Sequence, residues 1–129
     1  MLEIGMNHKI LRTVQPQYTA ASLKSGLLEV LATPIMIAWM EECCMECVQS
    51  QLEEGFGTVG TLVNVTHEAP TPVGGEVTVN CFLRQVDGRR LVFAVEASDK
   101  GGIIGRGSHE RFIVNGAKFQ EKCDKKKEN

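Results

Sequence analysis

The second half of the chain alternates hydrophobic and polar residues, with short turn sequences between the alternating stretches. Such period-two alternation predicts half-buried β-strands. We expect strands over 58–68, 76–86, about 91–97 and 103–114, with turns at 87–88 and 99–102, and a first strand over 8–14. The residues expected to face the core are Val59, Thr61, Val63, Val65, His67, Val77, Val79, Cys81, Leu83, Leu91, Phe93, Val95 and Ala97.

Between the first strand and the others lies one long helical pattern. Thr33 is a suitable N-cap and Pro34 a suitable first helical residue, and Gly55 is a suitable C-terminal stop. These signals predict a helix over 33–53. Its polar residues form one narrow stripe (Glu42, Glu46, Gln49 and Glu53), and the rest of its circumference is largely apolar. A helix of this kind is buried on most sides.

This order of elements predicts a single α+β domain over 1–129. One long central helix is wrapped by an antiparallel sheet of five to six strands, and 17–32 supplies a short helical piece and a loop broken at 25–26. One helix leaves part of such a sheet uncovered, which favours pairing with a second copy. The charged segment 122–129 is expected to fray.

Composition narrows the classes of function. The chain carries 14 basic and 16 acidic side chains, net −2, which argues against a nucleic-acid partner. No run reaches the ~20 apolar residues of a membrane span, and the N-terminus lacks the apolar core of a signal peptide. With five cysteines, an odd number, a reducing cytoplasmic location is expected.

Three side chains are candidates for chemistry. Glu41 lies about 100° from the acidic stripe among apolar neighbours, so it either reaches water at the stripe's edge or is held in a cleft. His67 extends the apolar face of its strand; it is either a hydrogen-bonded core residue or, paired with Glu41, a base. Thr33 either caps the helix or acts at its positive end. Eight residues separate Thr33 from Glu41, which is about 12 Å along a helix. The two side chains can therefore share one cleft only if substrate or His67 lies between them, or if a partner chain supplies one of them.

The other signals are weaker. Gly60 interrupts a strand and marks either a bulge or a backbone amide close to ligand. In the segment 109–111 the residues alternate faces, and Arg111 serves either a surface ion pair or anion recognition. The spacing of Cys43, Cys44 and Cys47 does not suit zinc, so no metal is expected and these thiols are interpreted as core packing.

Taken together, several segments resemble the fluoroacetyl-CoA thioesterase family of hotdog-fold enzymes. They are Ala-Thr-Pro at 32–34, Met-Glu at 40–41, Gly-Thr-Val-Gly at 57–60, Val-Thr-His at 65–67, Ala-Pro-Thr-Pro-Val-Gly-Gly at 69–75, Val-Asp-Gly-Arg-Arg at 86–90 and Gly-Ser-His-Glu-Arg at 107–111. The resemblance runs from about residue 8 to residue 122. It implies a hotdog fold, and dimers whose active sites lie at the subunit interface.

The resemblance also implies roles for individual residues. Thr33, Glu41 and His67 match the family's catalytic set, Gly60 matches a strand glycine, and Arg111 matches an arginine near the acyl pocket. The family enzyme has aromatic residues in the loop before the helix, whereas 24–31 here is aliphatic. This difference predicts a small or medium acyl group, accommodated by Leu27, Leu28 and Leu31.

The leading hypothesis is therefore hydrolysis of an acyl-CoA by a homodimer or tetramer, with no cofactor besides the CoA of the substrate. Thr33 or Glu41 acts as nucleophile, or Glu41 with His67 activates water, and the Gly60 amide stabilises the oxyanion. Arg89, Arg90, Arg106 and Lys118 are candidates for the CoA phosphates. The alternatives are a non-catalytic hotdog dimer that binds an acyl-CoA or small carboxylate and, with less support, an enoyl-CoA hydratase or dehydratase.

Overall fold

A computed structural model describes residues 1–128 and has five strands and one long helix. The strands are β1 (Asn7–Thr13), β2 (Phe56–His67), β3 (Glu76–Asp87), β4 (Arg90–Asp99) and β5 (Gly102–Asn115). The helices are α1 (Ala20–Leu23), α2 (Thr33–Gln49) and α3 (Gly116–Asp124), and single 3₁₀ turns cover Pro16–Tyr18 and Lys125–Glu128. The predicted α+β class and element order are confirmed.

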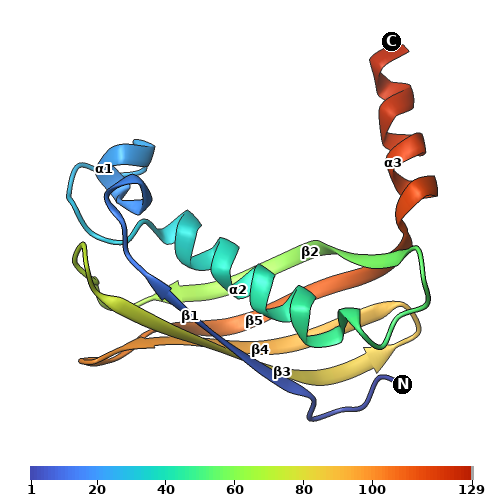
Figure 1. Cartoon of the computed structure of the whole chain (residues 1–129), viewed down its shortest axis with the longest axis horizontal. Helices are drawn as coiled ribbons and strands as arrows, with labels where there is room; N and C mark the ends of the chain where they lie inside the picture. Colours follow the sequence, from blue (N-terminus) through green and yellow to red (C-terminus); the bar gives the residue numbers. More distant parts are fainter. Residues whose placement is uncertain (129) are drawn as a thin grey trace.

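The five strands form one antiparallel sheet in the order β1-β3-β4-β5-β2. Figure 1 shows α2 lying along one face of this curved sheet, with α1 near its start. Strands β1 and β2 form the two edges. On β2 the side chains of Leu62 and Val63 are 43% and 42% exposed, so this edge presents apolar surface as well as backbone groups.

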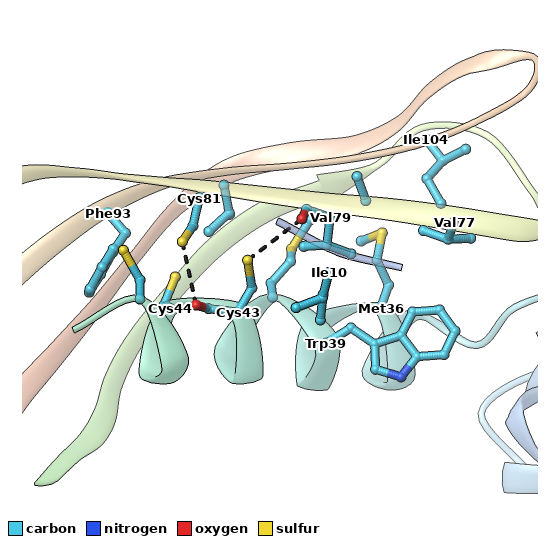
Figure 2. Packing of buried hydrophobic residues seen from close by; sticks show 14 of the residues in the cluster. Ile10, Met36, Trp39, Cys43, Cys44, Val77, Val79, Cys81, Phe93 and Ile104 are labelled. Carbon is cyan, nitrogen blue, oxygen red and sulfur yellow. Dashed lines mark hydrogen bonds between the residues drawn. The ribbon is translucent and has the colours of Figure 1, made fainter. Parts of the chain in front are cut away.

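The core fills the space between α2 and the sheet. Met36, Met40, Cys43, Cys44 and Val48 of the helix are buried against alternate residues of β3 and β4. Figure 2 shows Cys43, Cys44 and Cys81 with their sulfur atoms between the helix and β3. All five cysteines are free, and four are buried, which confirms the packing interpretation for these four; Cys123 is exposed.

The two glutamates of the acidic stripe that lie within α2 face β1. Glu42 accepts a hydrogen bond from Arg12 at 2.6 Å, and Glu46 lies 3.0 Å from the His8 ring. Both partners project from β1 toward the helix, because residues two apart on a strand share a face. The stripe thus lies along an edge strand of the sheet.

Both ends of α2 differ from the prediction. Ala32 is the N-cap and Thr33 the first helical residue, and no side chain caps this end. The helix ends at Gln49, four residues early, and the Gln49 side chain donates a hydrogen bond to the Phe56 carbonyl across the turn that follows. Gly55, with φ of +85°, lies in that turn.

The C-terminal segment forms helix α3, which extends away from the sheet (Figure 1). Asn115 caps it by accepting a hydrogen bond from the Lys118 amide. The charged segment expected to fray is helical as far as Glu128, and Asn129 lies outside the described residues. Across 1–128, none of the helices has the length and apolar character of a transmembrane segment.

Candidate active site

The start of α2 and the end of β2 meet at one end of the molecule (Figure 1). There the Thr33 hydroxyl lies 2.7 Å from Nδ1 of His67. Because Thr33 is the first helical residue rather than the N-cap, its hydroxyl makes no capping bond. The capping role expected for Thr33 is therefore wrong, and the hydroxyl is held by a histidine at the positive end of a helix.

The other ring nitrogen of His67 has an unusual environment. Its Nε2 is buried and has no hydrogen-bond partner among the described residues. Burial lowers the pKa of His67 below its usual value of 6.5, which keeps the ring neutral near pH 7. A neutral imidazole next to a hydroxyl can accept its proton.

A shallow pocket of about 240 Å³ opens at this pair. Its lining includes Ser25, Leu31, Thr33, His67 and Pro70. A larger hollow of about 720 Å³ lies between the loop around Pro72–Gly75 and the turn at Asp99–Lys100, and neither Thr33 nor His67 lines it. The smaller pocket is therefore the candidate active site, because Thr33 and His67 line it.

Glu41 belongs to a second cluster, two turns further along α2. Its Oε2 lies 3.6 Å from Nη1 of Arg111, and a Cβ built on Gly60 would come within 2.7 Å of the same oxygen. The carboxylate side chain is 40% exposed and its partner 7%. Glu41 is thus partly exposed to water, while its Oε2 faces a buried guanidinium.

A bulge in β2 shapes this second cluster. The β2–β5 register shifts between Gly60 and Leu62, so that Gly60 pairs with Arg111 and Val63 with His109. The shift reverses the alternation predicted for the first part of the strand. Val59 pairs with Phe112, which is 41% exposed, so Val59 lies on the face away from the helix, contrary to prediction.

Arg111 is buried and held by its own chain. Its Nε donates to Thr58 Oγ1 at 2.8 Å and its Nη2 to the Thr58 carbonyl at 3.0 Å. Burial lowers the pKa of Arg111 below that of a free guanidinium, and the nearby Glu41 opposes this shift. The surface ion pair considered for this segment is made instead by Glu110, which binds Arg90 at 2.8 Å.

Sequence reasoning missed His109, which lies beneath Arg111 with 1% of its surface exposed. The available signal was its position two residues before Arg111, which places both side chains on the same face of a strand. Leu27, expected near the acyl group, is 94% exposed and does not line the pocket at Thr33.

Five of the six predicted site residues therefore form two clusters rather than one, and the sixth, Leu27, belongs to neither. Thr33 and His67 are in contact at one end of α2, whereas Glu41, Gly60 and Arg111 meet near its middle. No described hydrogen bond or ion pair joins the two clusters within the chain. A hydroxyl–imidazole pair in one place, and a carboxylate, a guanidinium and a strand glycine in the other, suit acyl transfer and acyl recognition.

Comparison with known proteins identifies the family. The family model of the fluoroacetyl-CoA-specific thioesterase matches residues 14–117. The chain belongs to the fluoroacetyl-CoA thioesterase family. It is 41% identical over 115 residues to the fluoroacetyl-CoA thioesterase of Streptantibioticus cattleyicolor, spanning 89% of this chain and 83% of that one. Membership makes this chain a thioester hydrolase.

Solved structures agree with the fold. A fluoroacetyl-CoA thioesterase structure superposes with a TM-score of 0.93 at 37% identity, covering 98% of each chain. A Thermus thermophilus protein described as a thioesterase superfamily member gives 0.91 at 28% identity, over 99% of this chain and 95% of that one. A hot-dog-like protein from Thermanaerovibrio acidaminovorans gives 0.88 at 25% identity, over 97% and 93%. The predicted hotdog fold is confirmed.

Proposed function

We propose that this thioesterase hydrolyses a small or medium acyl-CoA to the free acid and CoA, with Thr33, Glu41 and His67 as its catalytic residues. One observation carries the proposal, namely the 2.7 Å contact between the Thr33 hydroxyl and a half-buried, neutral His67, two residues that line the same pocket. If Thr33 capped the helix, its hydroxyl would bind a backbone amide of α2 rather than the His67 ring.

The contact supports the following sequence of steps. His67 takes the hydroxyl proton as the Thr33 oxygen attacks the thioester carbonyl, and the first turn of α2 favours the negative charge that develops. The C–S bond breaks, the CoA thiolate takes the proton from His67, and water then hydrolyses the acyl-threonine. The same residues also allow attack by Glu41, or attack by water activated by Glu41 and His67, and trapping of an acyl-enzyme distinguishes these routes.

The second cluster completes the site if two copies pair. Thr33 and Glu41 lie about 12 Å apart along one rigid helix, too far for one small acyl group to contact both. The exposed apolar edge at Leu62 and Val63 offers a surface on which a second copy can pair. We therefore propose a homodimer in which Glu41, Gly60 and Arg111 of one copy face Thr33 and His67 of the other.

The substrate range follows from the loop before α2. The name of the 41% identical relative specifies fluoroacetyl-CoA, and variants of a fluoroacetyl-CoA thioesterase have been solved with fluoroacetate and with acetyl-CoA. In this chain the loop carries Leu27 and Leu28, which are 94% and 69% exposed and available to cover an aliphatic group. We propose that acyl groups without fluorine are accepted, in a cytoplasmic setting where acyl-CoA and free thiols coexist.

Two of the four cations considered for CoA binding are already engaged. Arg90 binds Glu110, and Arg106 binds Glu68 at 3.1 Å. No ion pair within residues 1–128 involves Arg89 or Lys118. These two remain the candidates for the phosphates.

The test is release of free CoA from a panel of acyl-CoA thioesters that includes acetyl-, fluoroacetyl- and butyryl-CoA. Wild type should turn over several of them, and His67→Ala and Glu41→Gln should each lose at least about a hundredfold in kcat. Glu46→Gln changes a carboxylate on the same helix that binds His8, and should leave turnover unchanged. Undiminished turnover in both site variants would contradict the assignment.

A further inference from the structure

His109 is a buried histidine that the proposed reaction does not use. It lies on β5 with 1% of its surface exposed, one of four buried polar residues in the described chain. A polar ring in this position loses its contacts with water and needs protein partners in return. It has two.

The two hydrogen bonds of His109 define its protonation. Nδ1 lies 2.8 Å from the Leu62 carbonyl, which can only accept, so Nδ1 carries the proton. Nε2 lies 3.0 Å from Nη1 of Arg111, and because a guanidinium can only donate, Nε2 is the acceptor. The bonded ring is therefore the neutral tautomer with its proton on Nδ1.

These bonds link the β2 bulge to the guanidinium of Arg111. Leu62 is the first residue in register after the bulge, and Gly60, just before it, pairs with Arg111 itself. Thr58 holds Nε and Nη2 of Arg111, and His109 holds Nη1. The same Nη1 is the atom 3.6 Å from Glu41.

Loss of the His109 acceptor would have a specific consequence. Nη1 would become a buried donor without its partner, and the Glu41 carboxylate, 3.6 Å away, is an acceptor of opposite charge within reach. Nη1 of Arg111 would then move toward Glu41 Oε2 and form a closer ion pair with it. The guanidinium would be held by Glu41 instead of staying available to the acyl group.

We infer that His109 is a positioning residue that holds the Arg111 guanidinium beside Gly60, so that it stays available to the acyl group of the substrate. This inference rests on the proposed function, in which Arg111 binds the acyl end. His109 itself does not touch substrate. Its contribution is the direction in which Nη1 points.

Three variants test this role by kinetics of CoA release. His109→Phe keeps a ring but removes both nitrogens, and should raise KM about tenfold or more, the factor for one lost hydrogen bond to a charged group, with a smaller change in kcat. His109→Gln keeps an acceptor near the Nε2 position and should recover KM to within about threefold of wild type. The control is His8→Phe, a histidine on β1 bound to Glu46, which should leave both constants unchanged.

Equal KM values for His109→Phe and wild type would overturn the inference, as would a loss in His109→Gln as large as in His109→Phe. Ring ¹⁵N NMR of wild type supplies a readout that needs neither turnover nor a folded variant. A protonated Nδ1 and an unprotonated Nε2 for His109 support the inference, and the opposite tautomer overturns it. If wild type releases no CoA from any thioester, the proposed function fails. The NMR tautomer then still shows whether Nε2 of His109 accepts the hydrogen bond from Arg111.

Discussion

The Thr33 hydroxyl lies at the first position of α2, one residue beyond the place where it would cap the helix. A side chain at the N-cap turns back to the free amides, whereas at the next position it points away from them. Here it reaches His67 across the interface between helix and sheet. A shift of one residue thus separates a structural role for this threonine from a chemical one.

This placement predicts that Thr33→Val lowers kcat by at least about a hundredfold with little change in stability, since no capping bond is lost. Thr19→Val is the matched control. Its hydroxyl caps α1 by accepting from the Ser22 amide, so this variant should lose about 1 kcal/mol of stability and keep its kcat. Kinetics of CoA release and urea denaturation measure the two effects. A Thr33→Val enzyme with normal kcat would exclude Thr33 as the nucleophile.

Two histidines, the half-buried His67 and the buried His109, predict the pH dependence of stability. Burial lowers the pKa of His67 and of His109 in the folded chain, so the unfolded chain binds protons at the higher pH. The free energy of unfolding should therefore fall as the pH drops below about 6.5, until the lowered pKa values are passed. Glu68 and Glu110, whose pKa values Arg106 and Arg90 lower, add their loss only below about 4.5.

Urea denaturation at pH 7.5, 6.5 and 5.5 checks this dependence. His67→Gln should remove part of the slope between pH 6.5 and 5.5, because Gln does not titrate. A free energy of unfolding that stays constant over this range would show that neither histidine differs between the folded and unfolded chain.

At the scale of elements, the bulge in β2 brings Gly60 opposite Glu41. Before the bulge, Thr58 and Gly60 face the helix; after it, Val63 does. The carboxylate occupies the space that a side chain at position 60 would fill. β2 and α2 can thus pack this closely at Glu41 because Gly60 has no Cβ.

This fit predicts that Gly60→Ala disturbs the site. The new Cβ would come within 2.7 Å of Glu41 Oε2 and 3.2 Å of His109 Cε1, so the carboxylate must move, and kcat/KM should fall about tenfold or more. Gly57→Ala on the same strand is the control, because its Cβ would meet only Gln49 Oε1, at 3.6 Å. Equal kcat/KM for the two variants would contradict the role given to Gly60.

The sequence predicted much of this architecture, and the reasons for its failures are local. The sequence pattern located all five strands, four of which (β1, β3, β4 and β5) contain buried residues, and the apolar circumference of α2 predicted its burial. Gly60 indicated a bulge as one of two alternatives, and the register shifts directly after it, but alternation carries no signal for an inserted residue, so the reversed phase at Val59 was missed. His109 was missed because its role depends on a hydrogen bond to Arg111, and such a bond cannot be predicted from the sequence alone.

At the scale of the whole molecule, the two clusters of one chain predict complementation between variants. Thr33→Ala and Glu41→Gln are each expected to be inactive. Random mixing makes about half of the dimers mixed, and each mixed dimer has one site with both residues intact. The mixture should therefore regain about a quarter of wild-type activity.

Unfolding and refolding the two variants together, followed by an assay of CoA release, tests this. The control is each variant refolded alone at the same total concentration, which should stay inactive. No recovery, with dimers verified by sedimentation, would mean that one chain supplies both residues to each site.

Thr33 and Glu41 project from the same uninterrupted helix, and this limits how the enzyme can diverge. A regular helix has a constant rise of about 1.5 Å per residue, so insertions and deletions in the loops cannot change the separation of these two groups. New substrate preferences must therefore arise from replacements in the loop before α2, while the helix keeps its length between positions 33 and 41. Among related enzymes, the residues that determine which acyl group is accepted can therefore vary freely only outside this helix.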